Sequence, residues 1–172
     1  MTVNNKTVAG TIFFVAGVIY IFGVGFGEHY SNNLVLNSSV VLLGLLMIVG
    51  AVFFQLARKS TVFTILLALA GIGTIGVGVF SVGSNVYYAF AYLGYLFFAF
   101  AAIVSYKYER SPLSIISLLL GILSLIMFGL WVSGVSIGGI VISPSFVDNL
   151  ILPWLIGFGA HIIGESDRKP AV

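Results

Sequence analysis

Six long apolar segments without a single Asp, Glu, Lys or Arg constrain the fold of this chain more than any other feature. A helix that crosses a bilayer needs about 20 mostly apolar residues. Charged residues make up only 7% of the chain, whereas about 25% is usual in soluble domains, so water cannot be its main solvent. We therefore predict an all-α membrane protein, a bundle of six transmembrane helices forming one domain over residues 1–172. The predicted helices are Val8–Phe26, Leu34–Leu56, Val62–Ser81, Val86–Tyr106, Leu113–Val132 and Asn149–Gly164.

The basic residues predict the orientation of this bundle. A chain that crosses the membrane six times through short connections places all seven of its Lys and Arg residues on one face. Basic residues accumulate on the cytoplasmic side of membrane proteins, so we expect both termini in the cytoplasm of a multi-pass protein of the cell membrane. A wrong helix count would distribute the cations over both faces. They are Lys6, Arg58, Lys59, Lys107, Arg110, Arg168 and Lys169.

The longest predicted loop, Ser133–Asp148, lies on the outer face between the fifth and sixth helices. Gly138 and Gly139 are flanked there by apolar residues, which is typical of a β-hairpin turn. The loop is expected to form a short β-hairpin or apolar cap; a disordered interfacial loop is the alternative. Trp131 and Trp154 are expected at the outer membrane interface, where aromatic residues concentrate.

A perfect G-x-G-x-x-G pattern lies in the third predicted helix, at Gly71, Gly73 and Gly76. A dinucleotide-binding pattern must follow a strand and open a helix, so that the phosphates meet the helix N-terminus. Here apolar residues continue on both sides, and the match is interpreted as chance. Small residues in membrane helices allow close packing instead. The third helix is therefore expected to be the central, tightly packed one.

Polar side chains gather toward the outer half of the bundle. Tyr88, Tyr92 and Tyr95 follow one another on one face of the fourth helix, which begins near Asn85. Their hydroxyl groups need hydrogen-bond partners, and Tyr20 and the polar start of the second helix, including Asn37, are candidates. Two interpretations are open: a polar-aromatic ligand pocket, or a layer of hydrogen bonds between helices, which we favour. The pocket would be lined by Asn37, Asn85, Tyr88, Tyr92 and Tyr95.

Other chemistry has little support in the residues. The chain has no Cys, which excludes a thiolate nucleophile or a Cys-ligated metal. Glu28, His29 and Asp148 are compatible with a divalent cation, but a solvated loop is the favoured interpretation. His161 and Glu165 are spaced for a proton relay, although an interfacial contact is preferred. We expect no catalytic residues, no cofactor, no metal and no nucleic acid partner.

The second to fourth predicted helices carry a family resemblance. The stretches NNLVLNSSVVLLGLLMIVGAVFF and LLALAGIGTIGVGVFSVGSNVYYAFAYLGYLFFAFAAIVS resemble the small six-helix membrane proteins catalogued as domain of unknown function nine hundred and ninety-eight, which are frequent in archaea. The resemblance implies a fold and a membrane location, and no reaction. Family members often carry a Pro after the Phe and a His opening the fourth helix, where this chain has Ser81, Asn85 and Tyr87.

Three classes of function remain. The first and favoured one is a non-catalytic accessory or structural subunit that packs against other membrane proteins or against itself. The second is a protein that binds or transports a lipid or small hydrophobe. The tyrosine face would form its binding surface, and the outer loop would act as a lid. The third, a lipid-modifying enzyme, lacks any recognisable set of catalytic residues, so we expect no enzyme activity.

Overall fold

A computed structural model describes residues 4–29, 33–137 and 140–166 of the chain. Each of the six α-helices in these ranges is long and apolar enough to cross a membrane, which confirms the predicted helices and the class of multi-pass membrane protein. The elements are α1 (Asn5–His29), α2 (Asn33–Arg58), α3 (Thr61–Val79), α4 (Asn85–Ser105), the short 3-10 helix η1 (Tyr106–Tyr108), α5 (Leu113–Val132), β1 (Ser136–Ile137), β2 (Ile140–Val141) and α6 (Pro144–Ser166).

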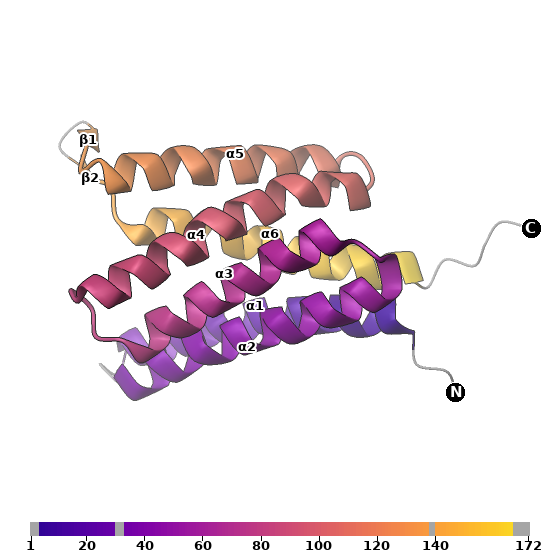
Figure 1. Cartoon of the computed structure of the whole chain (residues 1–172), viewed down its shortest axis with the longest axis horizontal. Helices are drawn as coiled ribbons and strands as arrows, with labels where there is room; N and C mark the ends of the chain where they lie inside the picture. Colours follow the sequence, from indigo (N-terminus) through magenta and orange to yellow (C-terminus); the bar gives the residue numbers. More distant parts are fainter. Residues whose placement is uncertain (1–3, 30–32, 138–139, 167–172) are drawn as a thin grey trace, which may run out of the picture.

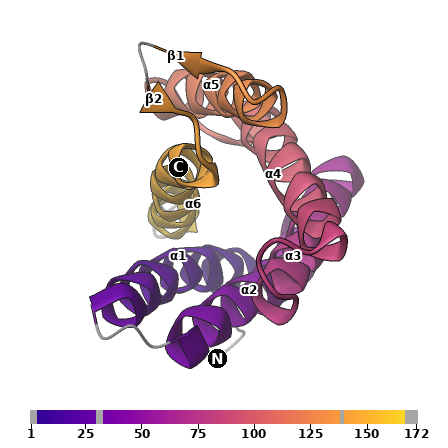
Figure 2. The same ribbon diagram turned by 90° about the vertical axis from the view of Figure 1, so that its left-hand side faces the viewer.

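The first five helices follow one another around an arc, and α6 lies on the concave side of that arc (Figure 2). Consecutive helices are neighbours, and α6 also contacts α1 and α4. The beginning of α1 and the end of α6 lie at the same end of the bundle (Figure 1). We call this the terminal end, and we call the opposite end, which holds the α3–α4 connection and the strands, the distal end.

The central helix is α6, so the expectation that the third helix is central was wrong. The close packing expected for α3 is nevertheless present. A Cβ atom added to Gly71 of α3 would lie 2.7 Å from the carbonyl oxygen of Gly44 in α2, and Gly73 faces the backbone of Gly94 in α4 in the same way. Glycines in α3 thus allow the backbones of α2, α3 and α4 to approach closely. The helix on the concave side of the arc, however, is α6.

The sixth helix begins earlier than the sequence indicated. It starts at Pro144, where a proline is well suited to a first helical turn, and Pro153 lies inside it and not in its first turn. As a result, Asp148 belongs to a helix instead of a loop. Before it, β1 and β2 form an antiparallel pair in which Ser136 is opposite Val141. Gly138 and Gly139, between the strands, lie outside the described residues.

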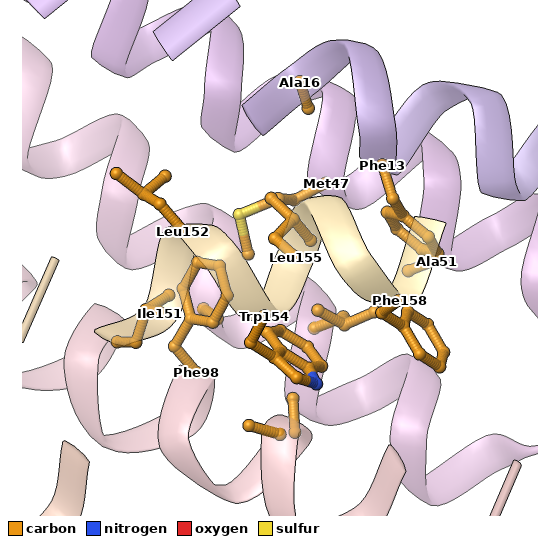
Figure 3. Close-up of a cluster of buried hydrophobic side chains, with 14 of the residues drawn as sticks. Phe13, Ala16, Met47, Ala51, Phe98, Ile151, Leu152, Trp154, Leu155 and Phe158 are labelled. Atoms are coloured by element: carbon orange, nitrogen blue, oxygen red, sulfur yellow. The ribbon is translucent and has the colours of Figure 1, made fainter. Parts of the chain in front are cut away.

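The hydrophobic core is built around α6. Figure 3 shows Trp154 and Phe158 of this helix packed among side chains from neighbouring helices, including Phe13 of α1 and Phe98 of α4. The rings of Trp154 and Phe158 stack with their centroids 5.6 Å apart. Trp154 is only 2% exposed, which corrects its expected position at the membrane interface. Its indole Nε1 donates a hydrogen bond to Ser105 Oγ at 3.0 Å.

The outer surface of the bundle is strongly apolar. Large hydrophobic side chains such as Phe22, Leu45 and Val62 are exposed along its sides. Helix α5 is the most peripheral, with many exposed Ile and Leu side chains, while its small residues Ser117 and Gly121 face inward. A surface of this kind is suited to a surrounding of lipid hydrocarbon.

Candidate functional site: a cleft at the distal end

A cleft with a volume of about 670 Å³ opens at the distal end between α1, α2, α3, α4 and α6. Its walls are formed by both apolar and polar side chains. The apolar part includes Val24, Val40, Val77 and Leu152. The polar side chains lining it are Tyr20, Asn37, Tyr87, Tyr95, Asp148 and Asn149.

A hydrogen bond crosses the floor of the cleft. The hydroxyl group of Tyr95 in α4 donates to Oδ2 of Asp148 in α6 at 3.2 Å. Both residues also line a smaller cavity of about 40 Å³, which is otherwise mostly apolar and extends to Leu43 and Phe98. The cleft therefore has a polar region around one carboxyl group and an apolar pocket adjoining it.

The predicted site residues divide into two groups. Asn37 and Tyr95 line the cleft, as expected for a pocket. Tyr88 and Tyr92, which were expected on the same face as Tyr95, are 37% and 38% exposed and are not among the lining residues. Asn85, at the first position of α4, is also exposed and outside the cleft.

The two exposed tyrosines belong to an aromatic contact with α5. The Tyr92 ring lies 5.3 Å from the ring of Trp131 and 5.9 Å from that of Phe128. The rings of Tyr88 and Tyr92 are tilted relative to each other, with centroids 6.3 Å apart. Tyr95 belongs both to the cleft and to this aromatic contact, because its ring also lies 5.6 Å from that of Trp131. This face of α4 therefore helps to attach the peripheral helix, and only its last tyrosine reaches the cleft.

Besides Asn149, the polar cleft residue that the sequence reasoning missed is Tyr87. It lies on the same face of α4 as the small residues Ala91 and Gly94, which are buried against neighbouring helices. Small residues mark the packed faces of membrane helices, so this pattern was a usable signal. Asp148 was assigned to the loop because the sixth helix was predicted to begin one residue later, at Asn149.

The terminal end has a different polar arrangement, centred on Glu165 near the end of α6. Lys6 of α1 and Arg58 of α2 both form ion pairs with its Oε2, the former at 3.1 Å. Arg110, which precedes α5, lies 3.9 Å from Oε1. Glu165, which the sequence analysis considered together with His161, is thus a carboxylate that joins three separate segments, and its side chain is only 14% exposed.

A second acidic residue, Glu109, is buried near the same end. Ser105 donates a hydrogen bond of 3.4 Å to its Oε1, while its Oε2 has no hydrogen-bond partner among the described residues. Burial raises the pKa of Glu109 from 4.5 to about 7, although hydrogen bonds from Ser117 and Ser105 act in the opposite direction. A carboxyl group in this setting takes up a proton near neutral pH.

Comparison with other proteins adds no further assignment. The chain matches no protein-family model, and no curated protein or solved structure matches it. The resemblance to the domain of unknown function therefore stays a prediction. Within the described ranges, no three His, Asp or Glu side chains come together as a metal site would require.

Proposed function

We propose that this protein binds a lipid or another small amphipathic molecule in the distal cleft. The observation that supports this proposal is the cleft itself, with a volume of about 670 Å³ and both polar and apolar walls. Ligand sites are concave, mostly apolar and contain a few polar groups that orient the ligand. In a bundle whose helices otherwise pack closely through glycines, such a space at one end favours a binding role over a purely structural one.

The proposal includes an orientation. The described cations lie at the terminal end, at positions 6, 58, 59, 107 and 110. Under the positive-inside rule that end faces the cytoplasm of the cell membrane, and the cleft then opens toward the outer leaflet. The β1–β2 segment lies at the same end as the cleft and is a candidate lid.

Single cysteines test this orientation cleanly because the natural chain has none. Lys59→Cys at the terminal end and Ser133→Cys at the distal end both introduce a thiol at an exposed position. In intact cells, a membrane-impermeant maleimide should label only the Ser133→Cys variant. If only the Lys59→Cys variant is labelled, the terminal end faces outward and the proposed topology is wrong.

The binding role is tested by purification in a mild neutral detergent followed by native mass spectrometry. We expect a lipid or amphiphile to remain bound to the wild-type protein. Val77→Trp places a large ring in the cleft and should abolish this retention. Val79→Trp is the matched control, since Val79 lies two residues away on α3 and is 61% exposed.

The same experiment addresses the accessory-subunit hypothesis. A subunit of a larger assembly would be recovered with partner proteins, and its ligand content would not respond to Val77→Trp. Exposed apolar residues do not discriminate between the two functions, because lipid and a protein partner cover such surfaces equally well. The accessory role therefore stays a prediction from the sequence.

A further inference from the structure

The polar side chains of the distal cleft have a specific chemical character. One carboxyl group, that of Asp148, lines the cleft together with the phenol side chains of Tyr20, Tyr87 and Tyr95. No Lys or Arg lines the cleft among the described residues, since the described cations lie at the terminal end, far along the bundle. A ligand that enters this site therefore meets an acidic group and aromatic faces without a competing cation of the protein.

This combination is suited to a positively charged ligand group. Ammonium groups are attracted to the faces of aromatic rings, and more strongly where water is excluded. A carboxylate adds a charge-assisted hydrogen bond or a direct ion pair. An anionic head group would instead be repelled by Asp148 and would find no Arg or Lys to compensate it.

The carboxyl group is also available to a ligand. Tyr95 donates its hydroxyl hydrogen to Oδ2 of Asp148, which fixes the position of the carboxyl group. Among the described residues, Tyr95 is the only side chain that donates a hydrogen bond to this carboxyl group. The Tyr95 hydroxyl thus orients Asp148 without occupying the second oxygen.

The apolar walls of the cleft indicate the chemical character of the remaining part of the ligand. Val24, Val40, Val77 and Leu152 line the cleft, and the adjoining cavity continues past Leu43 to Phe98. We propose that the cleft recognises an amphipathic amine: an ammonium group held by Asp148 and the surrounding tyrosines, with an alkyl or other apolar body against these walls. This inference rests on the proposed function and adds the charge of the ligand to it.

The test uses probes that share one alkyl chain and differ in charge. Octyltrimethylammonium, octylammonium, octanol and octyl sulfate are titrated by calorimetry into the purified full-length protein in a neutral glycoside detergent, with empty micelles as the blank. We expect both cationic probes to bind about tenfold more tightly than octanol, and octyl sulfate to bind more weakly than octanol. A stronger response to the primary amine indicates a hydrogen-bonded ligand; a stronger response to the quaternary amine indicates an aromatic cage of the kind that holds choline-like groups.

Two variants, one of them with a matched control variant, assign the effect to the cleft. Asp148→Asn should lower the affinity for the cationic probes about tenfold, to the level of octanol, and leave octanol binding unchanged. Tyr87→Leu should weaken cation binding several-fold. Tyr88→Leu, at the neighbouring position outside the cleft, should not weaken it. If the Asp148→Asn variant does not fold, the comparison of Tyr87→Leu with Tyr88→Leu still decides the question.

The outcomes separate this inference from the proposed function. If octanol and the cationic probes bind equally well and Asp148→Asn changes neither, the cleft binds amphiphiles without selecting a cation and the inference is wrong. If no probe binds and the ligand content of the purified protein does not respond to Val77→Trp, both the inference and the proposed function fail.

Discussion

The two ends of the bundle use the same helices in opposite ways. At the terminal end, Phe54, Phe63 and Phe158 from α2, α3 and α6 meet in one cluster, with the Phe63 and Phe158 centroids 5.1 Å apart. The Glu165 ion pairs join α1, α2 and the segment before α5 to α6. At the distal end the same helices enclose a cleft of about 670 Å³.

This difference indicates a division of roles along the membrane normal. Aromatic packing and ion pairs at the terminal end hold the helices in register, so the distal end does not need to be filled to maintain the fold. Substitutions at the terminal end should therefore lower stability, while substitutions in the cleft should affect binding more than stability. Each of the following experiments tests one side of this comparison.

The largest loss of stability is expected for Phe158→Ala. Phe158 is fully buried and contacts aromatic rings from α1, α2, α3 and α6. Removing such a ring leaves a cavity, and we expect the free energy of unfolding to fall by about 4 kcal/mol. The measurement is reversible unfolding in mixed micelles. Val77→Ala in the cleft should cost less than about 1 kcal/mol, because the space beside it is already open. Equal losses would refute the division of roles.

The next largest effect is a pH dependence that arises from Glu109. Its pKa is about 7 in the folded protein and 4.5 ordinarily. Between these values the folded state holds a proton that the unfolded state has lost. The contribution of Glu109 to the free energy of unfolding is therefore largest below pH 4.5, falls by about 3 kcal/mol as the pH rises to 7, and is constant above that.

Glu109→Gln provides the control for this pH dependence. The amide cannot titrate, so between pH 4.5 and 7 the stability of the variant should fall by about 3 kcal/mol less than that of the wild type. Unfolding in mixed micelles at a series of pH values measures both proteins. Parallel curves for the two would mean that Glu109 does not carry the effect.

A smaller loss is expected for Glu165→Gln, which removes the carboxylate shared by Lys6, Arg58 and Arg110. Lys6 and Arg58, which are partly buried, would then lack their counterion, and we expect a loss of about 2 kcal/mol. High salt should reduce the difference from the wild type. Lys107→Gln, an exposed basic residue of the same end, is the control and should change stability by less than about 0.5 kcal/mol. A loss as small as that of the control would show that the ion pairs do not anchor the helices.

The sequence predicted the helices much better than the site. Six charge-free apolar segments determine where helices form, because each must satisfy its backbone hydrogen bonds internally in a membrane. The position of α6 on the concave side of the arc has no such local cause. It depends on which faces pack best, for example Gly10 of α1 against Gly159 of α6, where an added Cβ atom on Gly10 would lie 2.8 Å from the Gly159 carbonyl oxygen.

Only part of the site was predicted from the sequence, and the reason is related. Tyr88, Tyr92 and Tyr95 share a helical face by spacing, but spacing does not tell which neighbour that face meets. In the structure the face turns toward α5, and the adjacent face with Tyr87 borders the cleft. Starting the sixth helix at Asn149 also kept Asp148 out of the bundle. A boundary error of a few residues thus removed Asp148, the carboxyl group among the described cleft residues, from the predicted pocket.

The smallest expected effect concerns the hydrogen bond between Tyr95 and Asp148. Tyr95→Phe retains the ring and removes only the hydroxyl group, and interhelical hydrogen bonds in membrane proteins contribute about 0.6 kcal/mol on average. We expect a loss of that size, and a double-mutant cycle with Asp148→Asn should give a coupling energy of the same magnitude. Tyr92→Phe is the control, because within the described part of the chain it is Tyr95 and not Tyr92 that bonds to Asp148. A coupling energy above about 2 kcal/mol would make this bond a main anchor of the distal end, and the contrast between a fixed terminal end and an open distal end would no longer hold.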